Sequence, residues 1–593
     1  MVNRTTKLRW RRRLKKRRKQ VEEIGVSAEQ GLEAHFFKRL GRLVNVWRFA
    51  ASWLLLLVLV AVGTVMQIRA LGQHYQTLQP ASGGTYTEGI IGTFTNANPL
   101  YATSAADSSV SRLVFSGLMK YDQDNKLVPD LAETVSVDSS GRVFTVKLRN
   151  DVKWHDGQPF TAKDVAFTYG IIKNPDARSP LFNTWKDISV SAKDTHTLVF
   201  ELPNVLSTFR EIITNGIVPE HLLKSIEPAQ LRTNKFNTIE PIGTGPFRWD
   251  ELEVAGTTQE SRQEVIGLLP NEDFYRNPPK ITRFIIRTFR DEKQMVQAYE
   301  GGELTSMVGL ASIPDNVREV PDFHEYNIPL TGAVMVFFKT SEPPLDDVKV
   351  RRALVQSVDV SQAIGGLGYP TKTVRGPLLE SHVGFSQKLT QLPTDLVQAA
   401  KYLDEAGWKK DATGIRKKAG KELTFTLYAQ NTSDYSAVTA YLQKAWKGMG
   451  IKVDVMLQSD ADMQGVVSRH DYDSLLHGIS IGTDPDVFAY WHSSQASPSS
   501  PSRLNFSEYK SKEADTALEA GRTRLDPKVR GAKYGPFLKA WREDAPALAL
   551  YQPAFLYVTR GTVYNFEPKS LNSITSRYVG VENWMIRQEK VIK

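Results

Sequence analysis

Hydrophobic and polar residues alternate in short runs over most of the chain beyond residue 85. Runs rich in β-branched and aromatic residues predict strands at Val143–Leu148, Thr197–Leu202, Ile281–Thr288, Leu423–Leu427 and Ile451–Leu457. Runs with apolar residues at helical spacing predict helices at Ser109–Met119, Asp347–Ile364, Asp395–Ala406 and Tyr435–Met449. Strands and helices mixed in this way predict an α/β body whose sheets are covered by helices.

A different pattern precedes the body. Residues 49–68 read FAASWLLLLVLVAVGTVMQI and contain no charged side chain. At about 1.5 Å per residue, such a helix reaches about 30 Å, the thickness of a bilayer core. This run predicts one transmembrane helix, with a cleaved signal peptide or a buried core helix as the alternatives. Apolar residues at helical spacing over 28–47 predict an amphipathic helix before it, and residues 69–84 are interpreted as a linker.

Charge is concentrated at the N-terminal end of the chain. The first 48 residues hold 15 of the 75 Lys and Arg and 4 of the 65 Asp and Glu, which leaves 60 basic and 61 acidic residues for the rest. Basic flanks stay on the cytoplasmic side of a membrane, so we expect residues 1–48 to be a cytoplasmic tail and the body to be extracytoplasmic. The tail is expected to contact anionic lipid head groups. No nucleic-acid partner is expected, since the body is close to neutral.

Several kinds of chemistry are excluded by composition and motif. The 593 residues include no cysteine, which excludes disulfides, thiolate metal sites, a Cys nucleophile and a lipid attached to Cys. The sequence contains no G-x-S-x-G, no H-E-x-x-H and no Walker A motif. We therefore expect no enzymatic activity, no cofactor and no metal site.

The stretch DVKWHDGQPFTAKDVAFTYG, residues 151–170, places His155, Asp156 and Asp164 close together in sequence. His155 and Asp156 are adjacent, so in an extended chain they point to opposite faces. Asp156-Gly157 instead predicts a turn, and Thr161 followed by Asp164 is a variant of the helix capping box. We interpret the stretch as strand, turn and capped helix rather than as a catalytic or metal site.

An ordered set of segments carries a family resemblance. LVPDLAETVSVDSSGRVFTVKLRNDVKWHDGQPFTAKDVAFTY (127–169) resembles the signature region of the family 5 extracellular solute-binding proteins, the oligopeptide, dipeptide and nickel binding components of ABC importers. GTFTNANPLY (92–101), PIGTGPFRW (241–249) and DPKVRGAKYGPFLKAWREDAPALALY (526–551) fit the same family in the same order. The resemblance covers roughly residues 85–590.

The resemblance implies an α/β, two-lobed periplasmic-binding-protein-like fold of type II, in the large cluster with an extra subdomain, here preceded by one transmembrane helix. On this basis lobe 1 comprises 85–288 completed by 555–593, and lobe 2 comprises 289–554. The hinge is expected near Thr288–Asp291 and Leu550–Tyr557. The implied function is binding of a peptide, or another small solute, between the lobes and its delivery to ABC permease subunits. Alternatives are a ligand sensor with the same fold and a non-peptide solute such as a nickel complex or a sugar.

Candidate ligand contacts follow from the family positions and form one set: Phe94, Thr95, Asn96, Tyr428, Asn431, Gly482, Thr483, Asp484, Asp486 and Trp491. One departure from the family concerns the amino group of a peptide. Peptide-binding relatives carry an Asp three residues before the acidic-Pro pair, and this position is Ile481 here. An apolar side chain cannot offset the desolvation of an ammonium group. Either another carboxylate, Asp484 or Asp486, takes this role, or the ligand is not a peptide bound in that way.

Overall fold

A computed structural model describes residues 4–32, 46–256, 262–310, 312–500 and 503–592. The chain divides into two compact units: Met1–Gln79 with Gln588–Lys593, and Pro80–Arg587. The second unit is the predicted α/β body, and it contains the candidate ligand contacts.

The first unit contains two helices, α1 (Arg4–Leu32) and α3 (Trp47–Tyr75). Within α3, Phe49–Ala70 is long and apolar enough to cross a membrane, and the predicted span lies inside it. The predicted linker is instead the end of α3 followed by strand β1 (Gln76–Ala81), which pairs with β24 (Arg587–Ile592). The amphipathic helix predicted before the span falls mostly on residues 33–45, outside the described residues.

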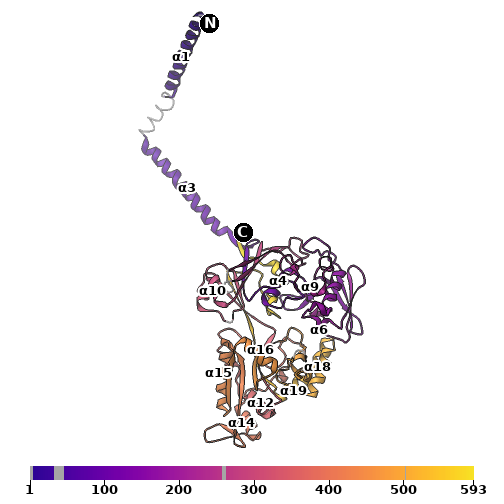
Figure 1. The fold of residues 1–593 in the computed structure, drawn as a ribbon. Helices are drawn as coiled ribbons and strands as arrows, with labels where there is room; N and C mark the ends of the chain where they lie inside the picture. Colours follow the sequence, from indigo (N-terminus) through magenta and orange to yellow (C-terminus); the bar gives the residue numbers. More distant parts are fainter. Residues whose placement is uncertain (1–3, 33–45, 257–261, 311, 501–502, 593) are drawn as a thin grey trace. The chain divides into compact units, whose positions relative to one another are not determined.

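The first lobe of the body is built on a seven-stranded sheet (Figure 1). Its strands in spatial order are β13 (Phe323–Pro329), β23 (Ala554–Arg560), β12 (Ser306–Val308), β2 (Thr85–Ile91), β11 (Arg283–Phe289), β10 (Gln263–Pro270) and β9 (Phe247–Ala255). β2 runs parallel to both of its neighbours, so it lies inside the sheet and is buried along most of its length. Figure 1 shows the yellow C-terminal segment among the purple strands of this lobe.

A smaller four-stranded antiparallel sheet belongs to the same lobe, with the order β5 (Ala132–Val137), β6 (Val143–Leu148), β8 (Thr197–Glu201) and β7 (Ser189–Ala192). It is accompanied by the hairpin of β3 (Met119–Tyr121) and β4 (Leu127–Pro129) and by helices α4 (Ala105–Val114), α5 (Ala162–Ile172) and α7 (Phe209–Ile212). The predicted strands in this region are confirmed. The predicted helix over 109–119 is displaced, because the Ser104 hydroxyl caps α4 and starts it earlier, and β3 begins at Met119.

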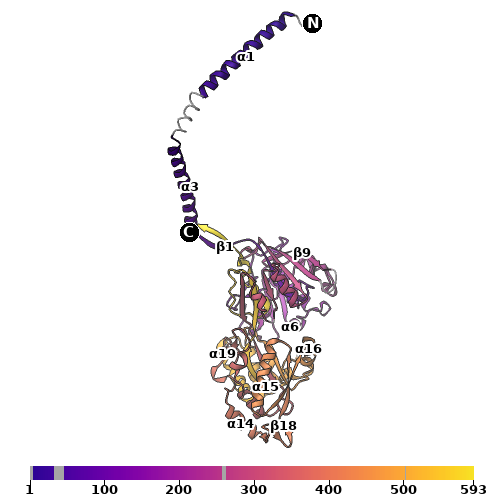
Figure 2. The ribbon, with the colours of Figure 1, turned by 90° about the vertical axis from the view of Figure 1, so that its left-hand side faces the viewer.

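The second lobe is built on a six-stranded sheet (Figure 2). Its order is β15 (Lys372–Thr373), β22 (Ala547–Gln552), β14 (Gly332–Phe338), β21 (Ser474–Ser480), β19 (Thr424–Gln430) and β20 (Lys452–Gln458). Its principal helices are α12 (Val348–Gln356), α13 (Val360–Ile364), α14 (Leu396–Glu405), α15 (Ser433–Gly448), α16 (Asp460–Arg469), α18 (Lys512–Arg522) and α19 (Pro527–Asp544). The predicted helices at 395–406 and 435–449 are confirmed, and the one predicted over 347–364 is two helices separated at Ser357–Asp359.

Strand β14 shows why helices cover both faces of this sheet. All seven of its residues are buried. Val336 and Phe338 pack into one core with α12, α14 and α15, whereas Met335 and Phe337 pack into a second core with α16, α18 and α19. Alternate side chains of a strand point to opposite faces, so an all-apolar strand needs a layer of helices on each side.

The chain crosses between the lobes twice. The first crossing is at Leu330–Thr331, between β13 and β14, and the second is at Pro553, between β22 and β23. The two crossings lie side by side, since the Leu330 amide donates to the Pro553 carbonyl at 2.8 Å. The second crossing falls in the expected region. The first corrects the expected boundary at residue 289, because β12 and β13 pair with strands of the first lobe.

Within residues 151–170 the predicted turn and capped helix are confirmed, but the residues before the turn form only an isolated bridge between Lys153 and Pro159 instead of a strand. Gly157 takes a φ of +87° in the turn, and Asp164 caps α5 by accepting from the Thr161 amide at 2.8 Å. His155 Nε2 donates to the Gly245 carbonyl at 3.0 Å, and its Nδ1 accepts from the Gly243 amide. Burial lowers the pKa of His155 to about 4, so the ring is neutral at physiological pH. His155 therefore holds the loop at 243–245 against the turn that precedes α5.

Candidate functional site

The loop after β21, residues 481–487, carries four of the predicted ligand contacts and is fixed to the first chain crossing. The amides of Ile481 and Gly482 both donate to the Thr331 carbonyl, at 2.9 Å and 3.0 Å. Gly482 takes a φ of +82°, a conformation that favours glycine. Its carbonyl accepts from His382 Nε2 at 2.9 Å. The loop therefore begins at the point where the chain passes from one lobe to the other.

The two predicted carboxylates of this loop are already paired within the second lobe. Both guanidinium nitrogens at the end of Arg530 donate to Asp484, a bidentate contact in which the side chains are 8% and 12% exposed. Asp486 pairs with Arg522 at 3.1 Å, and burial raises the pKa of Asp486. A planar guanidinium on a carboxylate is a strong, directional contact. Each of these acids is paired with an arginine of the same lobe.

Thr483 connects this loop to the first lobe. Its hydroxyl donates to Glu211 Oε1 at 2.9 Å, and Glu211 lies in α7 of the first lobe. Glu211 also accepts a hydrogen bond from the Tyr121 hydroxyl. A second contact joins the lobes nearby, since the Ser207 amide donates to the Arg522 carbonyl at 3.1 Å. The lobes therefore contact each other here through α7, Ser207, the 481–487 loop and Arg522.

The environment of Glu211 is unusual for a carboxylate. Burial, followed by the nearby negative charge of Asp484, raises the pKa of Glu211 to about 7. Among the described residues, no cation forms an ion pair with it. The sequence offered no signal for Glu211, because its partner Thr483 is 272 residues away.

The first-lobe residues predicted to contact ligand form a tightly bonded turn. Asp107 accepts from the Thr95 amide at 2.7 Å, the Thr95 hydroxyl at 2.8 Å and the Asn96 amide at 3.0 Å. Phe94 and Asn96 are buried, and Phe94 packs against Trp249. Of the three, only Thr95 presents an exposed side chain.

The remaining predicted contacts lie in the second lobe. Tyr428 is half-buried near the end of β19, and Asn431 is exposed just beyond it. Trp491 is fully buried, between the rings of Phe337 and Trp541. Trp491 therefore belongs to the core of the lobe, which corrects its assignment to a ligand-contacting surface.

A cavity of about 510 Å³ lies in the second lobe, at the end of β19. It is lined by Gln430, Met463, Gln464, Val467, Ser468, His477, Pro498, Ser500, Arg503, Leu504 and Phe506. None of the ten predicted contacts is among these lining residues. The family motif did not predict the walls of this cavity, because they come from β19, α16, β21, residues 498–500 and residues 503–506.

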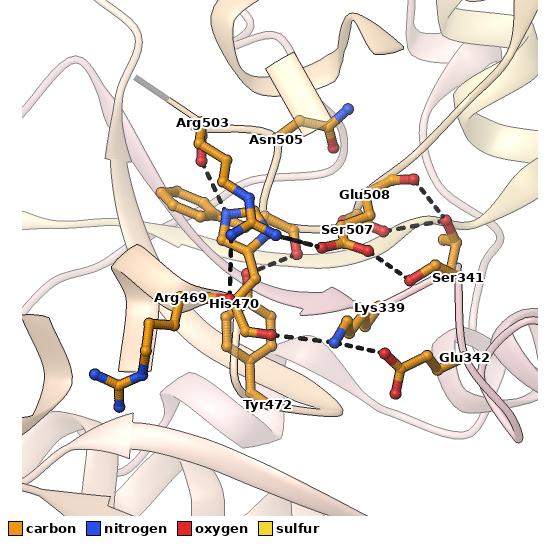
Figure 3. A network of polar contacts seen from close by, with 12 residues as sticks. Lys339, Ser341, Glu342, Arg469, His470, Tyr472, Arg503, Asn505, Ser507 and Glu508 are labelled. Atoms are coloured by element: carbon orange, nitrogen blue, oxygen red, sulfur yellow. Dashed lines mark hydrogen bonds and ion pairs between the residues drawn. The ribbon is translucent and has the colours of Figure 1, made fainter. Parts of the chain in front are cut away.

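The charged wall of this cavity is held by a polar network (Figure 3). Arg503 donates to Glu508 at 3.2 Å, and the buried ring of His470 lies between Glu508 and the Arg503 carbonyl, at 3.2 Å and 2.9 Å. The hydrogen bond from His470 lowers the pKa of Glu508 to about 2. Lys339 donates to the His470 carbonyl and pairs with Glu342. Because Arg503 is engaged in this network, the cavity suits a neutral or apolar group rather than an anion.

Comparison with known proteins identifies the family. Residues 126–500 match the sequence profile of the bacterial extracellular solute-binding proteins, family 5. The chain is 27% identical over 490 residues to the oligopeptide-binding protein AppA of Bacillus subtilis, with 80% of this chain and 87% of that protein covered. It is 31% identical over 468 residues to protein XP55 of Streptomyces lividans, with 75% and 80% covered.

A solved structure agrees with the fold. NikZ from Campylobacter jejuni, solved in complex with Ni(L-His), superimposes with a TM-score of 0.70 and 27% identity, over 84% of this chain and 99% of that one. The family is one of solute-binding proteins rather than enzymes, and the relatives include an oligopeptide-binding protein and putative ABC transporter peptide-binding proteins of Brucella species. The two lobes, the paired chain crossings and the matched segments agree with one another, and the chain belongs to the family 5 bacterial extracellular solute-binding proteins.

Proposed function

We propose that this protein is a membrane-anchored receptor that binds peptides between its two lobes and passes them to an ABC permease. The observation that carries the proposal is the Thr483–Glu211 hydrogen bond, which joins the 481–487 loop to the first lobe. A solute held at this place contacts both lobes only when they are closed, so it favours the closed state. The similarity to an oligopeptide-binding protein over most of both chains supports a peptide as that solute.

The cavity of the second lobe supports the same substrate class. Its lining includes Met463, Val467, Leu504 and Phe506, and its uncharged polar groups include Gln464, Ser468 and Ser500. Such a lining accommodates a side chain of moderate size without selecting a charge. Of the predicted contacts, Thr95, Tyr428, Asn431, Gly482 and Thr483 are retained in the proposal as residues that face solute.

Anchoring by α3 explains how such a receptor stays beside its transporter without an attached lipid. The span contains enough apolar residues to cross a bilayer core, and the basic residues before it favour a cytoplasmic N-terminus. Tethering raises the effective concentration of the receptor at the permease. Lipid head groups are the proposed contact of the basic tail.

The absence of cysteine gives a direct test of this topology. A single cysteine introduced at Gln20, in the tail, or at Thr233, an exposed position in the body, is the only thiol in its variant. In intact cells, a membrane-impermeant maleimide is expected to label Thr233→Cys and to label Gln20→Cys only after lysis. Labelling of both positions in intact cells contradicts the proposed orientation, and a mature protein that lacks residue 20 identifies a cleaved signal peptide.

Solute recovery tests the substrate class. We expect the full-length protein, extracted in mild detergent from its own cells, to retain a mixture of short peptides detectable by native mass spectrometry. The similarity to NikZ supports a nickel complex as the second candidate. Recovery of such a complex, or of a sugar, in place of peptides contradicts the peptide assignment and leaves the family unchanged.

A further inference from the structure

Glu211 is a half-buried carboxylate at the contact between the lobes that forms no ion pair with a cation in the described part of the chain. We propose that Glu211 is the residue that holds the free amino group of a bound peptide, in place of the Asp that peptide-binding relatives carry at the position of Ile481. The inference rests on the proposed function, since it needs a peptide as the solute. It assigns a specificity role to a residue of the first lobe, whereas the family motif places that role in the second.

Position 481 itself cannot take an amine. The Ile481 side chain is 9% exposed and packs into the second core of lobe 2 with Ala333 and Val487. Its amide is bound to the Thr331 carbonyl. An ammonium group placed there would lose its hydration without gaining a hydrogen-bond acceptor from the side chain.

Asp484 and Asp486, the two alternatives predicted from the sequence, already form ion pairs. Arg530 covers Asp484 with two donors, and Arg522 covers Asp486. These four side chains make two neutral pairs. An ammonium group bound to either acid would add a second cation to an Asp–Arg pair that is already neutral, and displacing Arg530, which is 8% exposed, would leave a buried cation unpaired.

Glu211 is the remaining carboxylate at this contact between the lobes. Its two known hydrogen-bond donors are the neutral hydroxyls of Thr483 and Tyr121. An ionised carboxylate offers about four acceptor positions, so two donors leave capacity for others. The side chain is half-buried and so is reachable from solvent, while its surroundings make a charge-assisted hydrogen bond stronger than at an exposed site.

The local charge also favours an incoming cation. With the two Asp–Arg pairs neutral, Glu211 in its ionised form carries the uncompensated negative charge among these five side chains. Burial and the neighbouring Asp484 both disfavour its ionised form. An ammonium group on Glu211 would neutralise this charge, and its three donors suit a carboxylate that already accepts from both lobes.

A simpler role for Glu211 is that of a latch whose hydrogen bond to Thr483 closes the lobes without touching solute. The two roles predict different dependence on the peptide N-terminus. A latch stabilises the closed state for every solute, whereas an amine acceptor stabilises it only for peptides with a free amino group.

The test uses the full-length protein in detergent and two peptide mixtures: randomised pentapeptides with free amino ends and the same mixture after N-acetylation. Glu211→Gln keeps the size of the side chain and an oxygen that accepts from Thr483, but removes the charge. We expect this variant to bind the free-amine mixture about 10-fold to 100-fold more weakly than wild type, and the acetylated mixture unchanged. Glu133→Gln, at an exposed position of the same lobe, is the matched control and is expected to bind both mixtures as wild type does.

The outcomes separate this inference from the proposed function. Equal losses for both mixtures identify a latch, and no loss for either removes Glu211 from recognition; each result overturns the inference and leaves peptide binding intact. If wild type binds neither mixture, the peptide assignment fails and the inference fails with it. Thermal unfolding of Glu211→Gln, compared with Glu133→Gln, shows whether a loss comes from recognition or from damage to the fold.

Discussion

Replacing Arg577 by Met is expected to destabilise the first lobe by about 3–5 kcal/mol, because it leaves a carboxylate buried without its cation. Arg577 and Glu88 are both 0% exposed, and their side chains approach to 2.6 Å. Glu88 lies in β2, in the interior of the seven-stranded sheet. Arg577 lies in the C-terminal segment that completes this lobe.

The pair belongs to a fully buried network. Glu88 also accepts from the hydroxyls of Tyr557 and Tyr578. Arg577 donates in addition to the Ser109 hydroxyl at 3.0 Å and the Ile574 carbonyl at 2.6 Å. The Glu88–Arg577 pair thus joins four parts of the lobe: β2, β23, α4 and the C-terminal segment. Removing the guanidinium breaks its contacts with Glu88, Ser109 and Ile574, and Met cannot replace them. Glu88 keeps its two hydrogen bonds from tyrosine hydroxyls but loses its cation.

Hydrogen exchange followed by mass spectrometry measures the effect locally, since loss of stability in the first lobe appears as faster exchange in β2 and β23. The double variant Glu88→Gln/Arg577→Met is expected to be less destabilised than the sum of the two single variants, because neither charge is then left alone. Lys569→Met is the control. It breaks an exposed ion pair in which the side chain of Lys569 is 76% exposed and that of Asp124 is 44% exposed, so it should change hydrogen exchange little. An Arg577→Met protein that exchanges like Lys569→Met would contradict the assigned role.

Local patterns predicted much of this fold, while contacts between distant segments were not predictable. The strand at 143–148 and the helix at 396–405 are specified by side chains a few residues apart, so periodicity was sufficient to find them. The first crossing was misplaced because β12 is only three residues long and joins the first lobe through pairing with β2 and β23. A three-residue strand has no pattern that tells which sheet it will join.

In the candidate site, too, the local motif was predicted but the distant partners were not. The turn before Pro485 was found from a motif, and its loop does lie where the chain passes between the lobes. The partners that decide its chemistry were not found: Arg530 lies 46 residues from Asp484, and Glu211 lies 272 residues from Thr483. Trp491 was misassigned because an aromatic residue beside a binding motif looks the same in sequence whether it faces solute or the core.

The second large effect is expected for Arg530→Met, which should weaken solute binding about 10-fold or more and destabilise the 481–487 loop by about 2–4 kcal/mol. Arg530 lies in α19, and its contact with Asp484 connects this helix to the loop. Its side chain also donates to the Gly521 carbonyl at 3.2 Å, at the end of α18. Without it, Asp484 is left as a second uncompensated carboxylate close to Glu211, and the two negative charges repel each other across the lobe contact.

This effect can be distinguished from a general loss of folding. The double variant Asp484→Asn/Arg530→Met removes both charges, so it is expected to recover part of the loop stability and part of the solute affinity. Hydrogen exchange of residues 481–487 measures the loop stability, and retention of the free-amine peptide mixture measures the solute affinity. If Arg530→Met binds peptides as wild type does, Asp484 is not needed in its paired form. In that case the neutral Asp484–Arg530 pair would not be required for Glu211 to bind the amine, which would contradict the proposed role of the local charge.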